Sequence, residues 1–393
     1  MRASRLLVVT AALLVPATAA IAQDGTELHV AADGSGDFET ITAAIEAATG
    51  GDIILIAPGT YVEYLFIDKP LRLRGDGARE EIAIFHDESV RQVRELEPVG
   101  PSVSTSCVDG VDVTIEHLSV MDADDSYVSI VLMGGESVLR DIHTEDFVGV
   151  RGEAVATIEA SYIERLGTWG PNQTTATGNT ITDLLIASEG SSGIFEDNTV
   201  TGLPIVVESG ADFGIFGNTV TPDVGEPGIV VADPGTRATA TGNDIEGGWV
   251  GVLVEFAGES LVEGNDIRGT EVGVVAVETL TTVRGNSIAD VTDTGIVADG
   301  DGMVIEGNAI SGGRVGVALA DPDDFPSEVP VLDEPPLVIG NTISDTSHFG
   351  IVIADTDPIV EQNSICAGRE AFKLSGDASP QIGSNEVCGS EGE

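Results

Sequence analysis

The sequence predicts an all-β chain folded as a coil of stacked parallel strands, with about 22 residues in each turn. Three observations support this prediction. A short phrase built around an asparagine recurs from Asn179 onward, apolar residues alternate over short segments of each repeat, and glycine interrupts these segments too often for a helix. A period of this length is typical of turns that stack and bury one continuous core.

The recurring asparagines are expected to form a structural ladder. The steps between them run from 19 to 25 residues, apart from one step of 33. At the corner of a stacked coil, an inward amide can donate a hydrogen bond to one neighbouring turn and accept one from the other. Asparagine also tolerates the left-handed backbone that a tight corner needs. The predicted ladder consists of Asn179, Asn198, Asn218, Asn243, Asn265, Asn286, Asn308, Asn341, Asn363 and Asn385.

Each turn is expected to contain three short strands with one buried face. Around Asn265, for example, Val262 and Ile267 occupy alternating positions, and Val274 and Ala276 repeat the alternation further along the turn. Earlier turns fit the same pattern without the asparagine, so the coil begins well before Asn179. In these earlier turns the same corner is predicted at Leu118, Ile142 and Ser161.

Residues 1–22 have the features of a secretory signal peptide. Arg2 and Arg5 precede an apolar run, and Ala20 and Ala22 frame a cleavage site. No second apolar run approaches the about 20 residues that span a bilayer. The sequence therefore predicts an exported protein, periplasmic or secreted, without a transmembrane segment.

Residues 23–77 are predicted to form a cap over the first turn, and residues 78–393 to form the coil itself. Within the cap, apolar residues recur at helical spacing over 37–49. Asp37 is the expected N-cap of this helix, and Gly50 begins the glycine pair that ends it.

The chain is strongly acidic, with 66 Asp and Glu residues against 17 Lys and Arg residues, for a formal net charge of −49. This charge disfavours nucleic acid and anionic membrane surfaces as partners. Two interpretations stay open. The acids keep an exported protein soluble, or they adapt it to high salt, where screening shortens their repulsion.

Two of the three cysteines are predicted to form a disulfide. Cys366 and Cys388 each follow a ladder asparagine by three residues, so they occupy the same place in consecutive turns. Strand spacing brings such positions within reach of a disulfide, and export permits its formation. Cys107 is expected to be a small buried apolar residue.

Residues 29–77 run from HVAADGSGDFETITAAI to LRLRGDG. This segment resembles the opening of pectin methylesterases and of NosD-type periplasmic copper-maturation proteins. The later G-N-x-I turns resemble the repeats of pectate lyases and mannuronan epimerases. These resemblances imply a right-handed parallel β-helix of the pectin lyase-like superfamily, with a short amino-terminal capping helix.

The catalytic motifs of those enzymes do not occur in this sequence. Pectin methylesterases carry Q-D-T, D-F-I-F-G and G-R-P-W stretches, and alginate-type epimerases carry a D-P-H signature. The resemblance therefore transfers the fold but no catalytic residue.

One sheet of the coil is predicted to present an apolar outer face. Its outward residues should be Val230, Leu253, Val275, Val297, Ala318 and Val352. Such a face can serve self-association or a partner, can be covered by a loop, or can be ordinary surface. The step of 33 residues exceeds the usual 22 by 11, so an inserted loop at about 321–336 is the candidate cover.

A column of acidic residues is predicted along the edge just past this sheet. Turn chemistry is one explanation, because aspartate before glycine or proline begins a turn. The alternative is that this edge binds Ca²⁺. We expect no cofactor to be required. For that alternative, the candidate metal ligands are Asp233, Glu255, Glu278 and Asp299.

A mixed polar cluster in the early turns is the candidate for chemistry. Acids, a histidine and an arginine in one groove could perform acid/base work on a sugar. The candidate catalytic residues are Asp124, Asp125, His143, Asp146 and Arg151. Tyr127, and Lys373 at the opposite end of the coil, are candidate substrate contacts. The alternative is a set of solvated surface residues.

The leading hypothesis is an exported β-helix protein that binds an extracellular or cell-surface glycan, or supports an assembly, without an identifiable catalytic apparatus. One alternative is a polysaccharide lyase, epimerase or esterase that uses the early cluster. A second alternative is a NosD-like role in the maturation of a metal centre.

Overall fold

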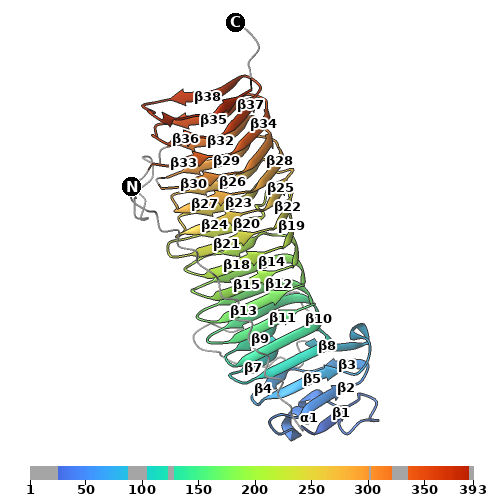
Figure 1. The fold of residues 1–393 in the computed structure, drawn as a ribbon. Coiled ribbons are helices and arrows are strands. Elements are labelled where there is room, and N and C mark those ends of the chain that lie inside the picture. The colour runs from blue at the N-terminus through green and yellow to red at the C-terminus, as the bar shows by residue number, and fades with distance from the viewer. Residues whose placement is uncertain (1–24, 87–103, 123–127, 301, 321–334, 389–393) are drawn as a thin grey trace.

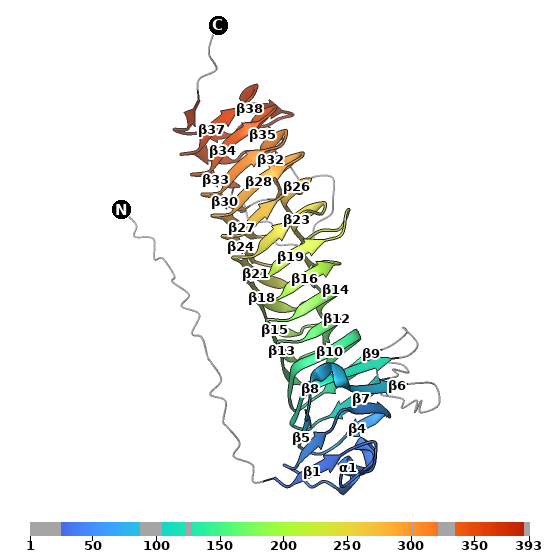
Figure 2. The same cartoon turned by 90° about the vertical axis from the view of Figure 1, so that its right-hand side faces the viewer.

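The computed structural model describes residues 25–86, 104–122, 128–300, 302–320 and 335–388. The chain is an all-β, right-handed parallel β-solenoid of about 14 turns, with roughly 22 residues per turn and 3% helix. It forms a long column with α1 at one end and β38 near the other (Figures 1 and 2). The predicted fold class is confirmed. The predicted signal peptide and most of the predicted insertion lie outside the described residues.

The first stack of strands precedes the ladder corner in each turn. It comprises β1 (Glu27–Val30), β2 (Ile53–Ile56), β5 (Leu71–Gly75), the first parts of β8 (Val113–Asp122) and β10 (Glu136–Arg151), β11 (Val155–Glu159), β13 (Gln173–Thr177), β15 (Ser192–Glu196), β18 (Asp212–Phe216), β21 (Arg237–Thr241), β24 (Ser260–Glu263), β27 (Thr281–Arg284), β30 (Val304–Glu306), β33 (Leu337–Ile339), β36 (Ile359–Glu361) and β39 (Gln381–Ile382).

The second stack follows the corner. It comprises β3 (Gly59–Val62), β6 (Ile82–His86), the later part of β8, the middle of β10, the first parts of β12 (Tyr162–Trp169) and β14 (Thr180–Ser188), β16 (Thr199–Gly202), β19 (Thr219–Pro222), β22 (Asp244–Glu246), β25 (Asp266–Arg268), β28 (Ser287–Val291), β31 (Ala309–Gly312), β34 (Thr342–Thr346), β37 (Ser364–Ala367) and β40 (Glu386–Val387).

The third stack completes each turn. It comprises β4 (Leu65–Ile67), β7 (Ser104–Asp109), β9 (Val128–Met133), the last parts of β10, β12 and β14, β17 (Ile205–Val207), β20 (Ile229–Ala232), β23 (Val250–Glu255), β26 (Val272–Val277), β29 (Thr294–Asp299), β32 (Val315–Ala320), β35 (Phe349–Ala354) and β38 (Glu370–Ser375). In β10 and β12 the second and third strands run on as one bent strand, and the pairing register shifts at the bend.

The inward side chains of all three stacks form one core. Val262, Ile267, Val274 and Ala276 are all essentially buried, as the alternation predicts. Parallel pairing without a register shift places the residues of one turn directly over those of the next, as Ile267 lies over Ile288. Each aliphatic side chain therefore packs against equivalents above and below, which no single turn could provide.

The asparagine ladder is present as predicted. The Oδ1 of Asn265 accepts hydrogen bonds from the backbone N–H and the Nδ2 of Asn243, both at 2.9 Å. Its own Nδ2 donates to the Oδ1 of Asn286 at 2.9 Å and to the carbonyl of Ala240 at 3.0 Å. The pattern repeats from Asn179 to Asn385. Each amide thus satisfies main-chain and side-chain groups of neighbouring turns.

The predicted corner of the earlier turns is also confirmed. The N–H of Ser161 donates to the Oδ1 of Asn179 at 3.0 Å, and its Oγ accepts from the N–H of Ile142 at 3.1 Å. Ile142 lies in register with Leu118, and both side chains are fully buried. The corner is therefore apolar at Leu118 and Ile142, then a serine at Ser161, and then an amide in every later turn described.

The left-handed backbone belongs to the residue before the ladder position, and the expectation that the asparagine adopts it is wrong. Gly264 has φ +62° and Gln362 has φ +59°. In the early turns this position is taken by His117 with φ +57° and Asp141 with φ +51°. Glycine reaches this conformation without a Cβ clash, which explains the first letter of the G-N phrase.

The capping helix is confirmed, but its predicted ends are wrong. Helix α1 spans Ile41–Ala47, and Thr40 is its N-cap, accepting a hydrogen bond from the N–H of Ala43. Phe38 pairs with the backbone of the first strand instead, since its N–H donates to the carbonyl of His29 at 3.0 Å. Asp37 therefore lies too far before the helix to act as its N-cap.

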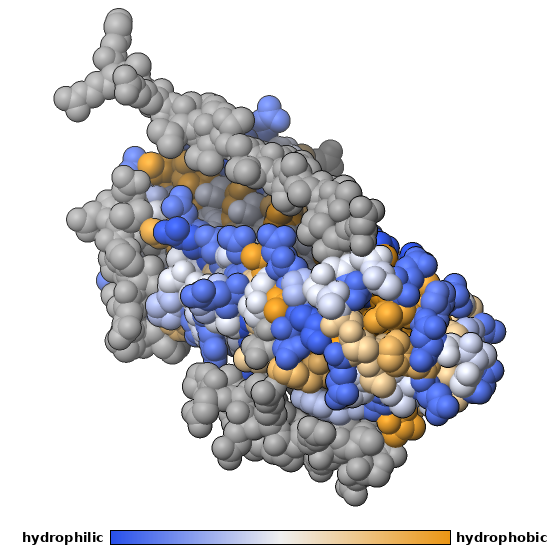
Figure 3. All heavy atoms as spheres, turned by 90° about the horizontal axis from the view of Figure 1, so that it is seen from below, coloured by the Kyte–Doolittle hydropathy of each residue, from blue (hydrophilic) through white to orange (hydrophobic). Residues whose placement is uncertain are grey.

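Side chains from the next turn hold both ends of α1. The carboxylate of Glu63 accepts from the N–H groups of Ile41 at 2.8 Å and Thr42 at 2.7 Å. At the other end, the Nζ of Lys69 donates to the carbonyl of Ile45 at 3.0 Å. The helix covers the first turn, and the view onto that end shows small hydrophobic patches among hydrophilic residues (Figure 3). The described part of the chain has one other helical segment, the 3₁₀ helix η1 (Arg79–Glu81).

A disulfide joins the last turn to the turn before it, as predicted. The Cα atoms of Cys366 and Cys388 lie 4.9 Å apart, on strands β37 and just after β40.

The left-handed corner gives a pair of opposite stability predictions. Gly264→Ala should destabilise the chain by about 1–2 kcal/mol, because a Cβ there meets open space and only the backbone cost remains. Gln362→Gly should stabilise the chain or leave it unchanged, because it removes that cost at an equivalent corner. Equilibrium unfolding in urea measures both. Equal effects of the two substitutions would contradict the assignment of the corner.

Asp52 in the cap gives a pH prediction. Its carboxylate accepts from the N–H and Oγ1 of Thr49 and from the N–H of Thr26, and these bonds, that from the Thr49 N–H foremost, lower its pKa. A lowered pKa stabilises the fold above the unfolded value of about 3.9, and this stability is lost as the pH falls through the folded value.

Asp52→Asn should therefore cost about 1 kcal/mol at neutral pH. The difference from the wild type should shrink as the pH falls below about 4. Thermal unfolding across that range tests this, with the exposed Asp68→Asn as control. A difference that stays constant with pH would contradict the role of the carboxylate.

Candidate functional site

The predicted early cluster falls on the bend between the second and third stacks. His143 and Arg151 both lie on the outer side of β10. Asp146 does not, because it is 4% exposed and accepts a hydrogen bond from the Oγ of Ser129 at 2.8 Å. The prediction that Asp146 shares an outer groove with the other two is wrong, since strand alternation turns it inward. Asp124, Asp125 and Tyr127 lie outside the described residues.

An aromatic platform lies on the third stack beside this bend. The indole of Trp169 lies across Gly167, where a Cβ would collide with both Trp169 and Phe147. The ring centroids of Phe147 and Trp169 are 5.2 Å apart, and the guanidinium carbon of Arg151 lies 5.0 Å from the Trp169 ring. We call Phe147, Arg151, Gly167 and Trp169 the Trp169 platform. Glycine at 167 is what allows the indole to lie against the backbone.

Arg151 is partly desolvated by this packing. Burial lowers the pKa of its guanidinium, and the charge of Glu189 acts in the opposite direction. An arginine stays protonated under such a shift. The platform therefore presents a cation stacked against an aromatic face, where partial burial strengthens the attraction.

A polar groove adjoins the platform at the bend. It encloses about 370 Å³ and is lined by Glu145, Tyr162, Glu164, Thr182 and Asp183. Tyr162 also stacks on the ring of His143, with centroids 4.7 Å apart and ring planes within 12°. We call this groove, together with the Trp169 platform, the early-turn surface.

The charged contacts in the groove are loose. The Nε of Arg165 lies 3.6 Å from Asp183 and its Nη2 lies 3.7 Å from Glu164. The Nε2 of His143 lies 3.8 Å from Glu145, whose side chain is 74% exposed. Exposed pairs at such distances contribute little to stability. These groups can therefore exchange their partners for a ligand at small cost.

The sequence reasoning missed most of this surface. It did not single out Phe147, Tyr162, Arg165, Trp169 or Asp183 as functional. A signal was present, because the segments FVGVR and RLGTW align on Gly149 and Gly167, which pair in register. That alignment alone places an aromatic residue and an arginine near each other on one outer face.

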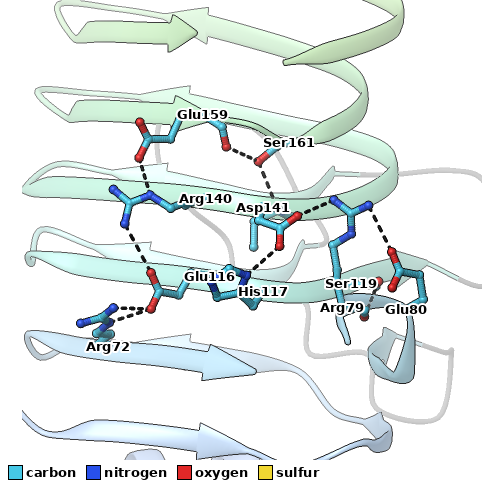
Figure 4. A network of polar contacts seen from close by, with 11 residues as sticks. Arg72, Arg79, Glu80, Glu116, His117, Ser119, Arg140, Asp141, Glu159 and Ser161 are labelled. Atoms are coloured by element: carbon cyan, nitrogen blue, oxygen red, sulfur yellow. Dashed lines mark hydrogen bonds and ion pairs between the residues drawn. The ribbon is translucent and has the colours of Figure 1, made fainter. Parts of the chain in front are cut away.

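A separate ionic network crosses the outer face of the first stack (Figure 4). Glu116 is 2% exposed and lies between Arg72, whose Nε donates at 2.9 Å, and Arg140, whose Nη1 is 3.6 Å away. Arg140 also contacts Glu159 in the next turn. The network thus ties four consecutive strands of the first stack together.

The adjoining corner holds a second group of three. Asp141 accepts from the Nη1 of Arg79 at 2.7 Å, and its other oxygen lies 2.6 Å from the Nδ1 of His117 (Figure 4). His117 and Asp141 are the left-handed residues of consecutive corners. Their mutual contact offsets the strain that glycine avoids in the later turns.

The predicted apolar face is in place. Val230, Leu253, Val275, Val297, Ala318 and Val352 pair in consecutive register along the third stack. Each side chain is half-buried. Lys373 continues the same column in β38, so it lies far from Arg151, as expected. Self-association through this face stays a prediction.

The predicted acidic column is wrong in its register, since its members belong to two columns. Glu255 and Asp299 lie on either side of Val277 in one column. Asp233 and Glu278 belong to the next position, where the backbone is left-handed. Asp233 accepts from Ser209, which is turn chemistry. Among the described side chains, no three of His, Cys, Asp or Glu lie close enough together to hold a metal ion.

Residues 168–325 match the family model described as "Right handed beta helix region". The chain is a right-handed parallel β-helix. No curated protein matches it. The predicted right-handed parallel β-helix is therefore confirmed.

Several solved structures are similar to this β-helix. The A-module of mannuronan C-5 epimerase AlgE6 from Azotobacter vinelandii is 17% identical over 89% of this chain and 94% of that one, with a TM-score of 0.41. The catalytic unit of the GH87 α-1,3-glucanase from Streptomyces thermodiastaticus is 15% identical over 88% and 67%, with a TM-score of 0.50. Pectin methylesterase PemA from Erwinia chrysanthemi is 14% identical over 61% and 78%, with a TM-score of 0.29. At identities this low, the similarity concerns the fold alone.

The described segments contain no helix that is long and apolar enough to cross a membrane.

Proposed function

We propose that this β-helix binds a polysaccharide at its early-turn surface. The observation that carries the proposal is the Trp169 platform, in which an indole lies across Gly167 with the Arg151 guanidinium against its ring. An aromatic face with one polar neighbour is suited to a sugar ring, which has an apolar face and a polar rim. Residues 1–22, predicted as a secretory signal, support a location outside the cytoplasm.

The groove beside the platform supplies hydrogen-bonding groups for sugar hydroxyls. Glu145, Glu164 and Asp183 offer carboxylate oxygens as acceptors, and Arg165, next to Glu164 and Asp183, offers donors. The charged contacts of Glu145 and Asp183 are 3.6–3.8 Å long, so a ligand can replace them. A few convergent polar groups next to an aromatic wall are typical of ligand sites.

Charge favours a neutral polysaccharide over a uronate polymer. Carboxylates outnumber cations in the groove, and the whole chain carries a formal charge of −49. A polyanion would be repelled by both. Arg151 and Arg165 do not offset this repulsion, because the three carboxylates of the groove outnumber them.

A catalytic role on the same glycan is a second candidate. It is favoured by the convergence of Glu145, Glu164 and Asp183 on one groove, since paired carboxylates can act as acid and base on a glycosidic bond. Release of reducing ends from the bound polysaccharide would distinguish turnover from binding alone.

Trp169→Ala tests the proposal, and Trp249→Ala is the matched control. Trp249 is 44% exposed and lies in the turn before β23, away from the platform. We expect Trp169→Ala to weaken binding of a neutral glucan or mannan roughly tenfold or more, and Trp249→Ala to leave it unchanged. Affinity electrophoresis and intrinsic fluorescence titration measure the effect.

The same assays with pectin and alginate test the charge argument. Tighter binding of a polyanion than of any neutral polysaccharide would contradict it. Binding that Trp169→Ala and Trp249→Ala weaken equally, or no binding to any polysaccharide, would overturn the proposed site.

A further inference from the structure

The corner that follows each third-stack strand repeats a left-handed residue from turn to turn. The non-glycine residues there include Glu189, Asp233, Phe256, Glu278 and Asp355, with φ between +47° and +76°. All of these side chains are exposed except one. Glu278 is 3% exposed, whereas Phe256, one turn earlier, is 38% exposed. A charged side chain is therefore buried at a corner position where the equivalent side chains of other turns are exposed to solvent.

The carboxylate of Glu278 has no hydrogen-bonding partner. Both of its oxygens are enclosed, and neither accepts a hydrogen bond. Its backbone N–H donates to the carbonyl of Asp299 at 2.8 Å, but this bond gives the carboxylate no hydrogen-bond donor. An ionised carboxylate buried in this way is costly unless a positive group or hydrogen-bond donors reach it.

The surroundings of Glu278 add negative charge. Glu255 and Asp299 pair in register on either side of Val277, the residue before Glu278. The segments 253–258, 275–281 and 297–300 contain no Lys, Arg, His or Cys. The local chain therefore supplies oxygen ligands and no cation to balance them.

We propose that Glu278 anchors a binding site for a hard divalent cation, with calcium as the ion that the donor set favours. Calcium takes six to eight oxygen ligands in flexible geometry, including bidentate carboxylates, backbone carbonyls and water. Transition metals that prefer histidine or cysteine have no such ligand in these segments. No three carboxylates of the described residues lie close enough together to hold one ion, so backbone carbonyls and water must supply the ligands beyond Glu278. The site therefore belongs to the weak class, with dissociation constants of about 10⁻⁴–10⁻³ M.

This inference is independent of glycan binding, because the early-turn surface lies in other turns. A bound calcium ion would balance the buried charge of Glu278 in the folded state, so the expected consequence of calcium is greater stability. Any ligand that binds only the folded state raises the melting temperature in this way.

Thermal unfolding of the full chain tests the site after treatment with a chelator. We expect millimolar calcium chloride to raise the melting temperature of the wild type more than sodium chloride does at equal ionic strength. Glu278→Gln should lose this calcium-specific rise. Without calcium, the variant should be at least as stable as the wild type, because the amide carries no charge to bury.

Glu189→Gln is the matched control, since Glu189 has the same left-handed backbone and an exposed side chain. It should keep the full response to calcium, and so should Trp169→Ala. Isothermal titration with calcium chloride should show one site in the wild type and none in Glu278→Gln. A wild type without a calcium-specific response, or a Glu278→Gln variant that responds like the wild type, would overturn the proposal.

Discussion

The coil depends on one repeated corner. A residue with left-handed backbone turns the chain, and the next residue points an amide inward, where its oxygen takes two donors from the preceding turn. Its nitrogen then donates to the next turn and to a main-chain carbonyl. Because every buried polar group at the corner is paired in this way, the turns can stack in constant register. Constant register in turn places like aliphatic side chains over one another and closes the core.

The candidate functional surface occurs where this regularity is weakest. In β10 and β12 the second and third strands are continuous, and the pairing register shifts at the bend. The groove around Tyr162 and the platform around Trp169 therefore lie on either side of this bend. In later turns a tight turn occupies this position, as at Gly269. The outer side of the third stack is then aliphatic, as at Val275. The early turns thus vary the outer surface of a scaffold whose later turns repeat closely.

The period of about 22 residues predicted the features that recur from turn to turn. The ladder, the disulfide between Cys366 and Cys388 and the outward column that includes Leu253 all follow from counting residues between asparagines. Counting residues did not predict the side-chain positions where the turns are irregular. Strand alternation in β10 turned Asp146 inward, and the left-handed corner at Glu278 displaced part of the acidic column by one position, so that the column divided in two. Long-range contacts were beyond the count as well, since nothing near α1 in the sequence indicates that Glu63 binds its first turn.

The most direct test of the ladder is the unfolding free energy of Asn265→Ala, measured in urea against the exposed neighbour Ser287→Ala. The substitution removes the acceptor of two Asn243 donors and the donor to Asn286 and Ala240. Because each unpaired buried group costs about 1–3 kcal/mol, the ladder predicts a loss of about 3 kcal/mol or more for Asn265→Ala. Ser287→Ala should stay within about 0.5 kcal/mol of the wild type. An Asn265→Ala variant as stable as Ser287→Ala would contradict the central role of the ladder.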